Sequence, residues 1–136
     1  MTIPGKWAVV EISAYTSAHL EGVLQLCSDE GWPTFVESPE RAHRALVAPG
    51  VTTVVATSEG AVVGFAQLQS DGEIRAHLSL LVVSKDLRRQ GIGRLLLSEA
   101  LAKGGGTRID LVTDSGAEFY DALPHKTFKG YRLYLS

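Results

Sequence analysis

The residues best suited to chemistry lie in one short turn, Arg88-Arg89-Gln90-Gly91-Ile92-Gly93-Arg94. Its arginines supply full positive charge, and its glycines let a ligand approach the backbone closely because no Cβ is in the way. The apolar run Leu80–Val83 before the turn predicts a buried strand, and the apolar spacing of residues 92–101 predicts a helix after it. The first N–H groups of a helix have no internal partner, and the helix dipole adds partial positive charge there. The turn therefore predicts a phosphate site at a helix N-terminus.

The glycine pattern narrows the class of phosphate ligand. The dinucleotide fingerprint Gly-x-Gly-x-x-Gly is not present, and no Gly-Lys-Ser/Thr of a P-loop follows. The turn resembles the Arg/Gln-x-x-Gly-x-Gly/Ala signature of the GNAT N-acetyltransferase superfamily, matched by Arg88, Gly91 and Gly93. The preceding strand ends at Val83, five residues before the arginine, as is usual in that family. The resemblance implies that the turn holds the pyrophosphate of acetyl-coenzyme A.

The same resemblance extends the cofactor site to the end of the preceding strand. It implies that the backbone N–H of Leu81 donates to the oxyanion of the reaction and that Val83 pairs with the pantetheine. The cofactor-binding residues that it implies are Leu81, Val82, Val83, Arg88, Arg89, Gln90, Gly91, Ile92, Gly93 and Arg94.

Length and composition fit one ordinary globular domain covering residues 1–136. A net charge of −2 gives no reason to expect nucleic-acid or membrane binding. The one cysteine, Cys27, excludes an internal disulfide and a cysteine-based zinc site, and no metal is expected. It shares a predicted helical face with Leu20, Val23 and Leu24, which favours a core position over a nucleophile. No apolar run is long enough for a signal peptide or a membrane span, so a cytoplasmic protein is expected.

The chain before residue 84 predicts two helices and a meander of strands. The expected order is a strand at 7–12, a helix from Thr16 or Ser17 to about Asp29, a loop at 30–37, a helix from Ser38-Pro39-Glu40 that ends by Pro49-Gly50, and antiparallel strands at 51–57, 61–69 and 73–83.

The remainder predicts a crossover and a last helix and strand. The helix after the turn stops at Gly104-Gly105-Gly106, and a strand at 107–112 follows, parallel to 73–83 because a helix connects the two. Ser115 and Glu118 predict a capping box, and the alternation of 130–135 predicts a closing strand. The order β-α-α-β-β-β-α-β-α-β is that of the GNAT fold, an α/β fold with one mixed sheet. The resemblance implies a sheet splayed between its fourth and fifth strands.

Amine acetylation needs an acid for the departing thiolate, and Tyr120 is the predicted donor. Ala117-x-Phe119-Tyr120 resembles the Ala-x-x-Phe-Tyr helix of the family, with one residue fewer before the aromatic pair. The family's tyrosine lies near the coenzyme sulfur, and a phenol with pKa ~10 stays protonated at pH 7. Packing at a sheet edge is the alternative role for Tyr120. Leu123-Pro124-His125-Lys126 stands where the family usually has Gly-Phe.

The base that deprotonates the amine is less clearly marked. Strand alternation predicts one face for His77, Ser79 and Leu81, and small-amine GNAT enzymes have histidines at a position similar to that of His77. A structural histidine is the alternative. Glu37 is a second candidate, and a water relay without one essential base is a third.

The acceptor is predicted to bind beneath the loop between the first two helices, as the resemblance implies. Trp32, Phe35 and Glu37 combine aromatic rings with a carboxylate, which suits an amine cation. A core role for Trp32 and Phe35 is the alternative.

The sequence thus predicts an N-acetyltransferase that moves the acetyl group of acetyl-coenzyme A to a small-molecule primary amine by direct attack, without a covalent enzyme intermediate. A catalytically silent acyl-coenzyme A-binding module and acetylation of a protein or peptide amine remain alternatives, and a homodimer remains open.

Overall fold

The computed structural model describes residues 2–4, 9–114 and 116–135, with only the backbone of 2–4 described. In this part of the chain six strands form one sheet in the order β1-β2-β3-β4-β5-β6. They are Thr2–Pro4, Val9–Ala14, Val51–Ser58, Ala61–Ser70, Arg75–Val83 and Arg108–Asp110. Every neighbouring pair is antiparallel except β5 and β6, which are parallel, as the predicted crossover requires.

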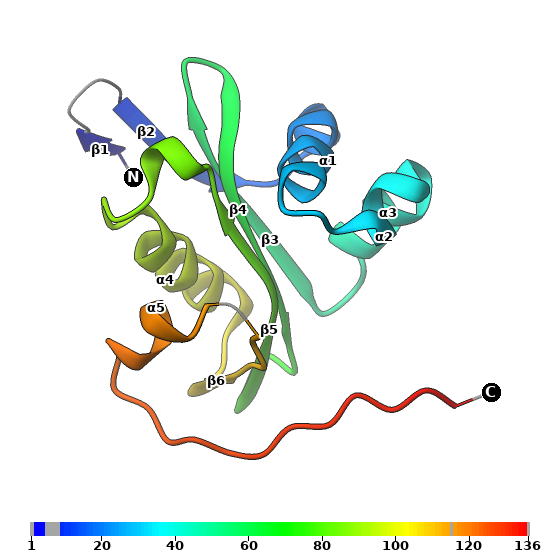
Figure 1. Ribbon diagram of the computed structural model, residues 1–136, viewed down its shortest axis with the longest axis vertical. Helices are drawn as coiled ribbons and strands as arrows, with labels where there is room; N and C mark the ends of the chain where they lie inside the picture. Colours follow the sequence, from blue (N-terminus) through cyan, green and yellow to red (C-terminus); the bar gives the residue numbers. More distant parts are fainter. Residues whose placement is uncertain (1, 5–8, 115, 136) are drawn as a thin grey trace.

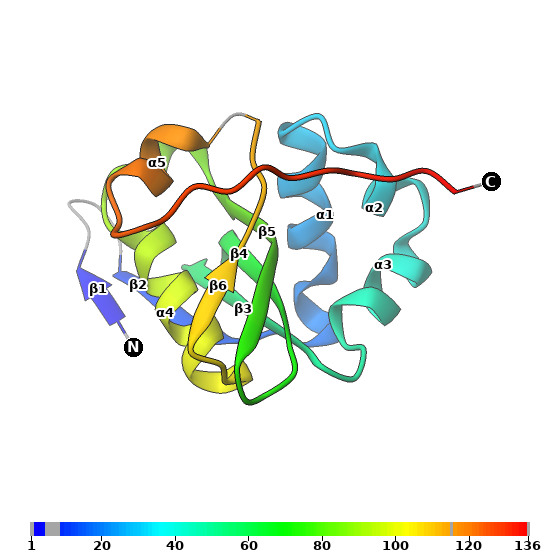
Figure 2. The same ribbon diagram turned by 90° about the horizontal axis from the view of Figure 1, so that it is seen from below.

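Helices cover both faces of the sheet. They are α1 (Leu20–Asp29), α2 (Pro33–Glu37), α3 (Pro39–Leu46), α4 (Ile92–Gly104) and α5 (Ala117–Asp121), with 3₁₀ turns η1 (Ser17–His19) and η2 (Lys85–Leu87). The two views agree that α4 lies on one face and that α1 to α3 lie on the other (Figures 1 and 2). Each face therefore has its own core.

The two cores are distinguished by the helices that complete them. The α4-side core joins β2 to β5 with α4 through residues that include Ala66, Leu68, Ile92, Leu96 and Ala100. The α1-side core joins β3, β4 and β5 with α1 and α3 through residues that include Val23, Cys27, Leu46, Phe65 and Val82. A central strand such as β4 thus buries apolar side chains on both faces, which explains its long run of buried residues.

The sheet opens between β5 and β6. Their pairing covers Arg75–His77 against Arg108–Asp110, while β5 continues to Val83. The predicted splay between the fourth and fifth strands is confirmed, because these are β5 and β6 once β1 is set aside. The C-terminal part of β5, after His77, therefore has β4 on one side and an open edge on the other.

Several predicted elements are confirmed with small changes at their ends. Thr16 is the N-cap of the first turn, and its N–H donates to His19 Nδ1 at 2.9 Å. The meander β3-β4-β5 and the helices α3 and α4 lie where the sequence predicts them. The first predicted strand corresponds to β2, which continues to Ala14 instead of ending at Ile12. Trp7 lies outside the described residues, and β1 adds a strand that was not predicted.

Two of the predicted secondary-structure assignments are wrong. The segment 30–37 is not a loop throughout, because Pro33 starts the short helix α2 in the position that proline favours. Residues 130–135 do not close the sheet: they are extended but belong to no strand, and Tyr131, Leu133 and Leu135 are at least 75% exposed. Alternation gives strand propensity, but a strand also needs a partner strand, and the tail passes β6 and runs on, apart from the sheet, to the side of the molecule on which α1 to α3 lie (Figures 1 and 2). The predicted cap Ser115 lies outside the described residues, and Gly116 is the N-cap of α5.

Among the described residues, no helix combines the length and apolar character that crossing a membrane requires.

Candidate active site

The glycine turn leads into α4, whose first backbone N–H groups point out of the N-terminal end of the helix. Gly91 is the N-cap at φ 87°, a left-handed conformation that glycine adopts without steric cost. The first helical bond is from Leu95 N–H to the Gly91 carbonyl at 3.1 Å, so the N–H groups of residues 92–94 precede the helical hydrogen-bond ladder. Gly91 has no side chain with which to cap this end of the helix. Arg89 and Arg94, both exposed, add positive charge to the turn.

The open edge of β5 ends beside this turn. Ser84 N–H donates to the Val63 carbonyl of β4, whereas the Val83 carbonyl accepts from Arg88 Nε at 3.1 Å on the other side. Backbone groups alternate in direction along a strand. Leu81 and Val83 therefore direct their N–H and C=O groups toward the opening that β6 leaves, where a ligand amide can pair with them.

The helix α5 packs against the start of α4. A Cβ built on Gly93 would lie 3.4 Å from the Phe119 ring and 3.8 Å from Val83 Cγ2, so the missing side chain of Gly93 lets three elements meet. Tyr120 packs edge-on against Phe119, with ring centroids 5.0 Å apart, and adds to the α4-side core. Burial raises the pKa of Tyr120 above its ordinary value of 10. The phenol of Tyr120 therefore stays protonated at neutral pH.

A β-bulge changes the predicted placement of His77. The pairing with β4 steps from Leu80 opposite Gln67 to Leu78 opposite Leu68, which leaves Ser79 as the extra residue. Ala76 and Leu78 lie in the α4-side core, and so does Leu81. His77 therefore faces the opposite side from Leu81, and the prediction that His77, Ser79 and Leu81 share one face is wrong. Simple alternation cannot anticipate this, because the extra residue reverses it.

The new position of His77 is at the fork of the sheet. Its partners across the strands are Gln69 on β4 and Asp110 on β6, the last pair before β5 and β6 separate. The side chain is exposed and points to the face that α1 to α3 cover.

The predicted acceptor residues lie on that same face. Trp32 and Phe35 are partly buried and pack against the α1-side core, while Glu37 is exposed at the C-terminal end of α2. The predicted core position of Cys27 is confirmed. Its pKa is raised to about 11, first by burial and then by the charge of Glu30, so it is a poor nucleophile at neutral pH.

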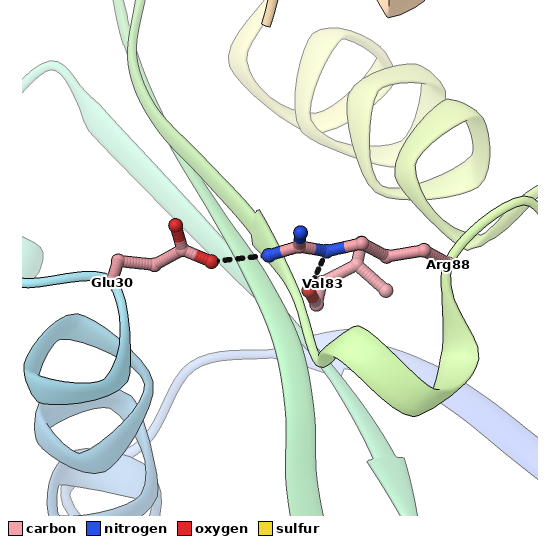
Figure 3. A network of polar contacts seen from close by, with 3 residues as sticks. All are labelled: Glu30, Val83 and Arg88. Carbon is pink, nitrogen blue, oxygen red and sulfur yellow. Dashed lines mark hydrogen bonds and ion pairs between the residues drawn. The ribbon is translucent and has the colours of Figure 1, made fainter. Parts of the chain in front are cut away.

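The sequence pattern gives no sign of a role for Glu30, whose side chain contacts Arg88 of the glycine turn. Its carboxylate forms an ion pair with the Arg88 guanidinium, whose Nε donates to Val83 (Figure 3). The two charged residues are 58 positions apart, and nothing in the sequence pattern connects them. The contact joins the C-terminal end of α1 to the end of β5.

These elements together bring the N–H groups at the start of α4 and the open backbone edge of β5 beside the aromatic pair of α5. No set of three or more His, Cys, Asp or Glu side chains suited to a metal ion is found in the described ranges.

Comparison with known proteins agrees with this geometry. The sequence profile of the acetyltransferase (GNAT) domain matches residues 17–115. A mycothiol acetyltransferase from Streptomyces griseus is 34% identical over 106 residues, which are 75% of this chain and 34% of that protein. The chain thus spans about a third of the length of this relative.

Solved structures share the fold over nearly the whole chain. A GNAT family acetyltransferase from Streptococcus pneumoniae is 25% identical with a TM-score of 0.71, and the match covers 93% of this chain and 98% of that one. The aminoglycoside N-acetyltransferase AAC(6')-Iy, solved in complex with CoA, is 18% identical with a TM-score of 0.77 and 98% of each chain covered. At that identity the second likeness shows the fold alone. Signature turn, splayed sheet and profile match agree, and the chain belongs to the GNAT acetyltransferase family.

Proposed function

We propose that this chain is an acetyl-coenzyme A-dependent N-acetyltransferase that acts on a primary amine of a small molecule by direct attack in a ternary complex. The observation that carries the proposal is the meeting of the open end of β5, the N-terminus of α4 and the aromatic pair of α5 around Gly93. Each supplies one requirement of acetyl transfer from a coenzyme A thioester.

The cofactor site follows from two sets of backbone groups. The free N–H groups at the start of α4, with Arg88, Arg89 and Arg94 nearby, suit the pyrophosphate. The open edge of β5 suits the pantetheine amides at Val83, and the N–H of Leu81 suits the oxyanion that forms at the thioester carbonyl. The other proposed cofactor contacts are Val82, Gln90, Gly91, Ile92 and Gly93.

Two side chains are proposed to move protons. Tyr120 donates to the departing thiolate, since burial keeps its phenol protonated. His77 accepts the proton of the attacking amine, directly or through water, from the face where the amine is proposed to enter. This division supports direct attack, because Cys27 is buried and offers no covalent intermediate.

The acceptor is proposed to bind on the α1 side of the opening, near Trp32, Phe35 and Glu37. The exposed carboxylate of Glu37 and the partly exposed rings suit a small cation. The Streptomyces relative is named for mycothiol and AAC(6')-Iy is named for aminoglycosides, so both names point to small-molecule substrates. They support the class of acceptor rather than one compound.

The test is release of the coenzyme A thiol from acetyl-coenzyme A in the presence of neamine, spermidine, tyramine or glucosamine, with the acetylated amine identified by mass spectrometry. The proposal expects turnover with at least one of these amines. Tight coenzyme A binding without turnover of any amine, including a basic peptide, would instead make the chain an acyl-coenzyme A-binding module. Turnover of the peptide alone would move the acceptor to a protein amine.

A further inference from the structure

We propose that Glu30 changes partners during the reaction cycle: Arg88 holds it in the free protein, and it binds the ammonium group of the acceptor after a coenzyme A phosphate has taken Arg88. The inference rests on the proposed function and adds a binding residue and an order of binding to it.

The first observation is that Arg88 is occupied in the free protein. Its Nη2 pairs with the Glu30 carboxylate, and its Nε donates to the Val83 carbonyl at 3.1 Å (Figure 3). The arginine that matches the family signature thus lies across the open edge of β5 and is not directed at the N-terminus of α4. A ligand that runs along β5 and reaches α4 must compete for the same guanidinium.

The second observation is that the pair is accessible. The side chains of Arg88 and Glu30 are 46% and 27% exposed, so an incoming anion can reach the guanidinium. Exposed ion pairs are weak, whereas a phosphate offers more charge and a geometry that arginine binds through two parallel hydrogen bonds. With the α4 N-terminus beside it, a phosphate group is the stronger partner.

The third observation concerns what Glu30 meets once Arg88 leaves. Glu30 is the C-cap of α1, where the helix dipole places partial negative charge. Its charge already acts on the neighbouring thiol, raising the pKa of Cys27 in addition to burial. The carboxylate and the helix end together favour a cation, two residues before Trp32 in the chain.

These steps give an order of binding. Before the cofactor arrives, Arg88 neutralises Glu30 and the acceptor has a weaker cation site. After the phosphate binds Arg88, the Glu30 carboxylate is free beside the opening, on the face of the sheet from which we propose that the amine attacks. The amine therefore binds better to the cofactor complex than to the free protein.

The calorimetric test uses coenzyme A as the probe, titrated into the wild type, Glu30→Gln, Arg88→Gln and the double variant. Without the Glu30 carboxylate to compete for Arg88, the Kd of coenzyme A should be about two- to fivefold lower for Glu30→Gln than for the wild type, the range that an exposed ion pair allows. In the Arg88→Gln background the same change should have no effect. The matched control is Asp29→Asn, which removes the neighbouring charge, whose partner is Gln25, and should leave the Kd unchanged.

Two calorimetric results would overturn the proposal. If Asp29→Asn lowers the Kd of coenzyme A as much as Glu30→Gln does, the cause is a general charge effect. The same conclusion follows if Glu30→Gln still lowers the Kd in the Arg88→Gln background. An unchanged or higher Kd in Glu30→Gln, with its unfolding temperature retained, would mean that no competition exists.

The kinetic test uses whichever of neamine, spermidine, tyramine and glucosamine is turned over. Glu30→Gln should raise the KM of that amine about tenfold or more with kcat within threefold, while Asp29→Asn matches the wild type. An unchanged KM would overturn the role of Glu30 in acceptor binding. If the wild type binds coenzyme A but turns over no amine, the proposed function fails while calorimetry still decides the competition for Arg88.

Discussion

The side chain of Tyr120 combines two properties that a proton donor needs. It packs against the α4-side core and against Phe119, the ring that lies beside Gly93, and burial raises its pKa above 10. A raised pKa keeps the phenol protonated until the pH rises through that value, so the acid should remain competent throughout the range from pH 7 to 9.

We expect Tyr120→Phe to lower kcat by ~10²–10⁴-fold, the usual loss for a general acid, because the ring still packs but has no proton to give. The Kd of coenzyme A should change little. Tyr131→Phe in the exposed tail is the matched control and should behave as the wild type. Full turnover by Tyr120→Phe would remove the residue from the mechanism.

His77 can be tested through the pH dependence of the rate. If it removes the proton of the amine, His77→Gln should lower kcat/KM at pH 7 by at least tenfold and recover as the pH rises, because the amine then loses its proton to solvent. Initial rates from pH 6 to 10 give this profile. A parallel loss at every pH would indicate a structural role.

Among single residues, the sequence predicts those whose role depends on the conformation of the backbone next to them. Gly91 and Gly93 could be identified because a turn before a helix needs them at fixed spacing. The Arg88–Glu30 pair could not, since it depends on how α1 packs across the sheet. The face of His77 was mispredicted because one extra residue, Ser79, reverses the alternation.

The turn between β4 and β5 depends on one carboxylate. Asp71 Oδ1 accepts from the N–H groups of Glu73 and Ile74, both at 2.8 Å, and Arg75 N–H also donates to this side chain. These hydrogen bonds, first that of Ile74, lower the pKa of Asp71. This turn fixes where β5 begins, and therefore which β5 residues lie opposite β4 and which lie at the open edge.

We expect Asp71→Ala to lower the unfolding temperature at pH 7, whereas Glu73→Ala should leave it unchanged. A lowered folded-state pKa means that the contribution is fully present above the unfolded value of about 4 and is lost as the pH falls through the folded value. The difference between wild type and Asp71→Ala should therefore shrink below about pH 4. Thermal denaturation at pH 7, 5 and 3 measures it, and a difference that does not depend on pH would contradict this account.

Elements with strong local signals were predictable. The helix α3 has a proline in its first turn, α4 has a glycine stop, and the meander has turn residues at each hairpin. The short helix α2 was missed because five residues give little periodicity. The closing strand at 130–135 was wrong because pairing is a tertiary property that alternation alone does not supply.

The whole molecule consists of one packed sheet with helices on both faces and an exposed C-terminal tail. The tail contacts the segment after β6 at Gly130, where a Cβ would lie 2.6 Å from Val112 Cγ1. Beyond that point large apolar side chains remain exposed, among them Tyr134 and Leu135 at 85% and 89%.

We expect trypsin to cleave first at Lys126, Lys129 or Arg132, because the backbone there is outside the strands and helices and the side chains are exposed. Limited proteolysis followed by intact-mass analysis would show the loss of these residues before any cut in the sheet. A tail that resists trypsin while the sheet is cut would mean that it is covered in solution, for example by a second copy of the chain.

The central claim, a coenzyme A site built on the start of α4, is tested most directly by calorimetric titration of coenzyme A into the wild type, Gly91→Val and Gly60→Val. Both glycines have positive φ, 87° and 82°, and open space where a Cβ would lie, so both variants carry similar backbone strain. Only Gly91 is beside the proposed phosphate site. The account predicts one coenzyme A per chain, a Kd at least tenfold higher in Gly91→Val, and wild-type affinity in Gly60→Val. No binding to the wild type, or undiminished affinity in a folded Gly91→Val, would contradict it.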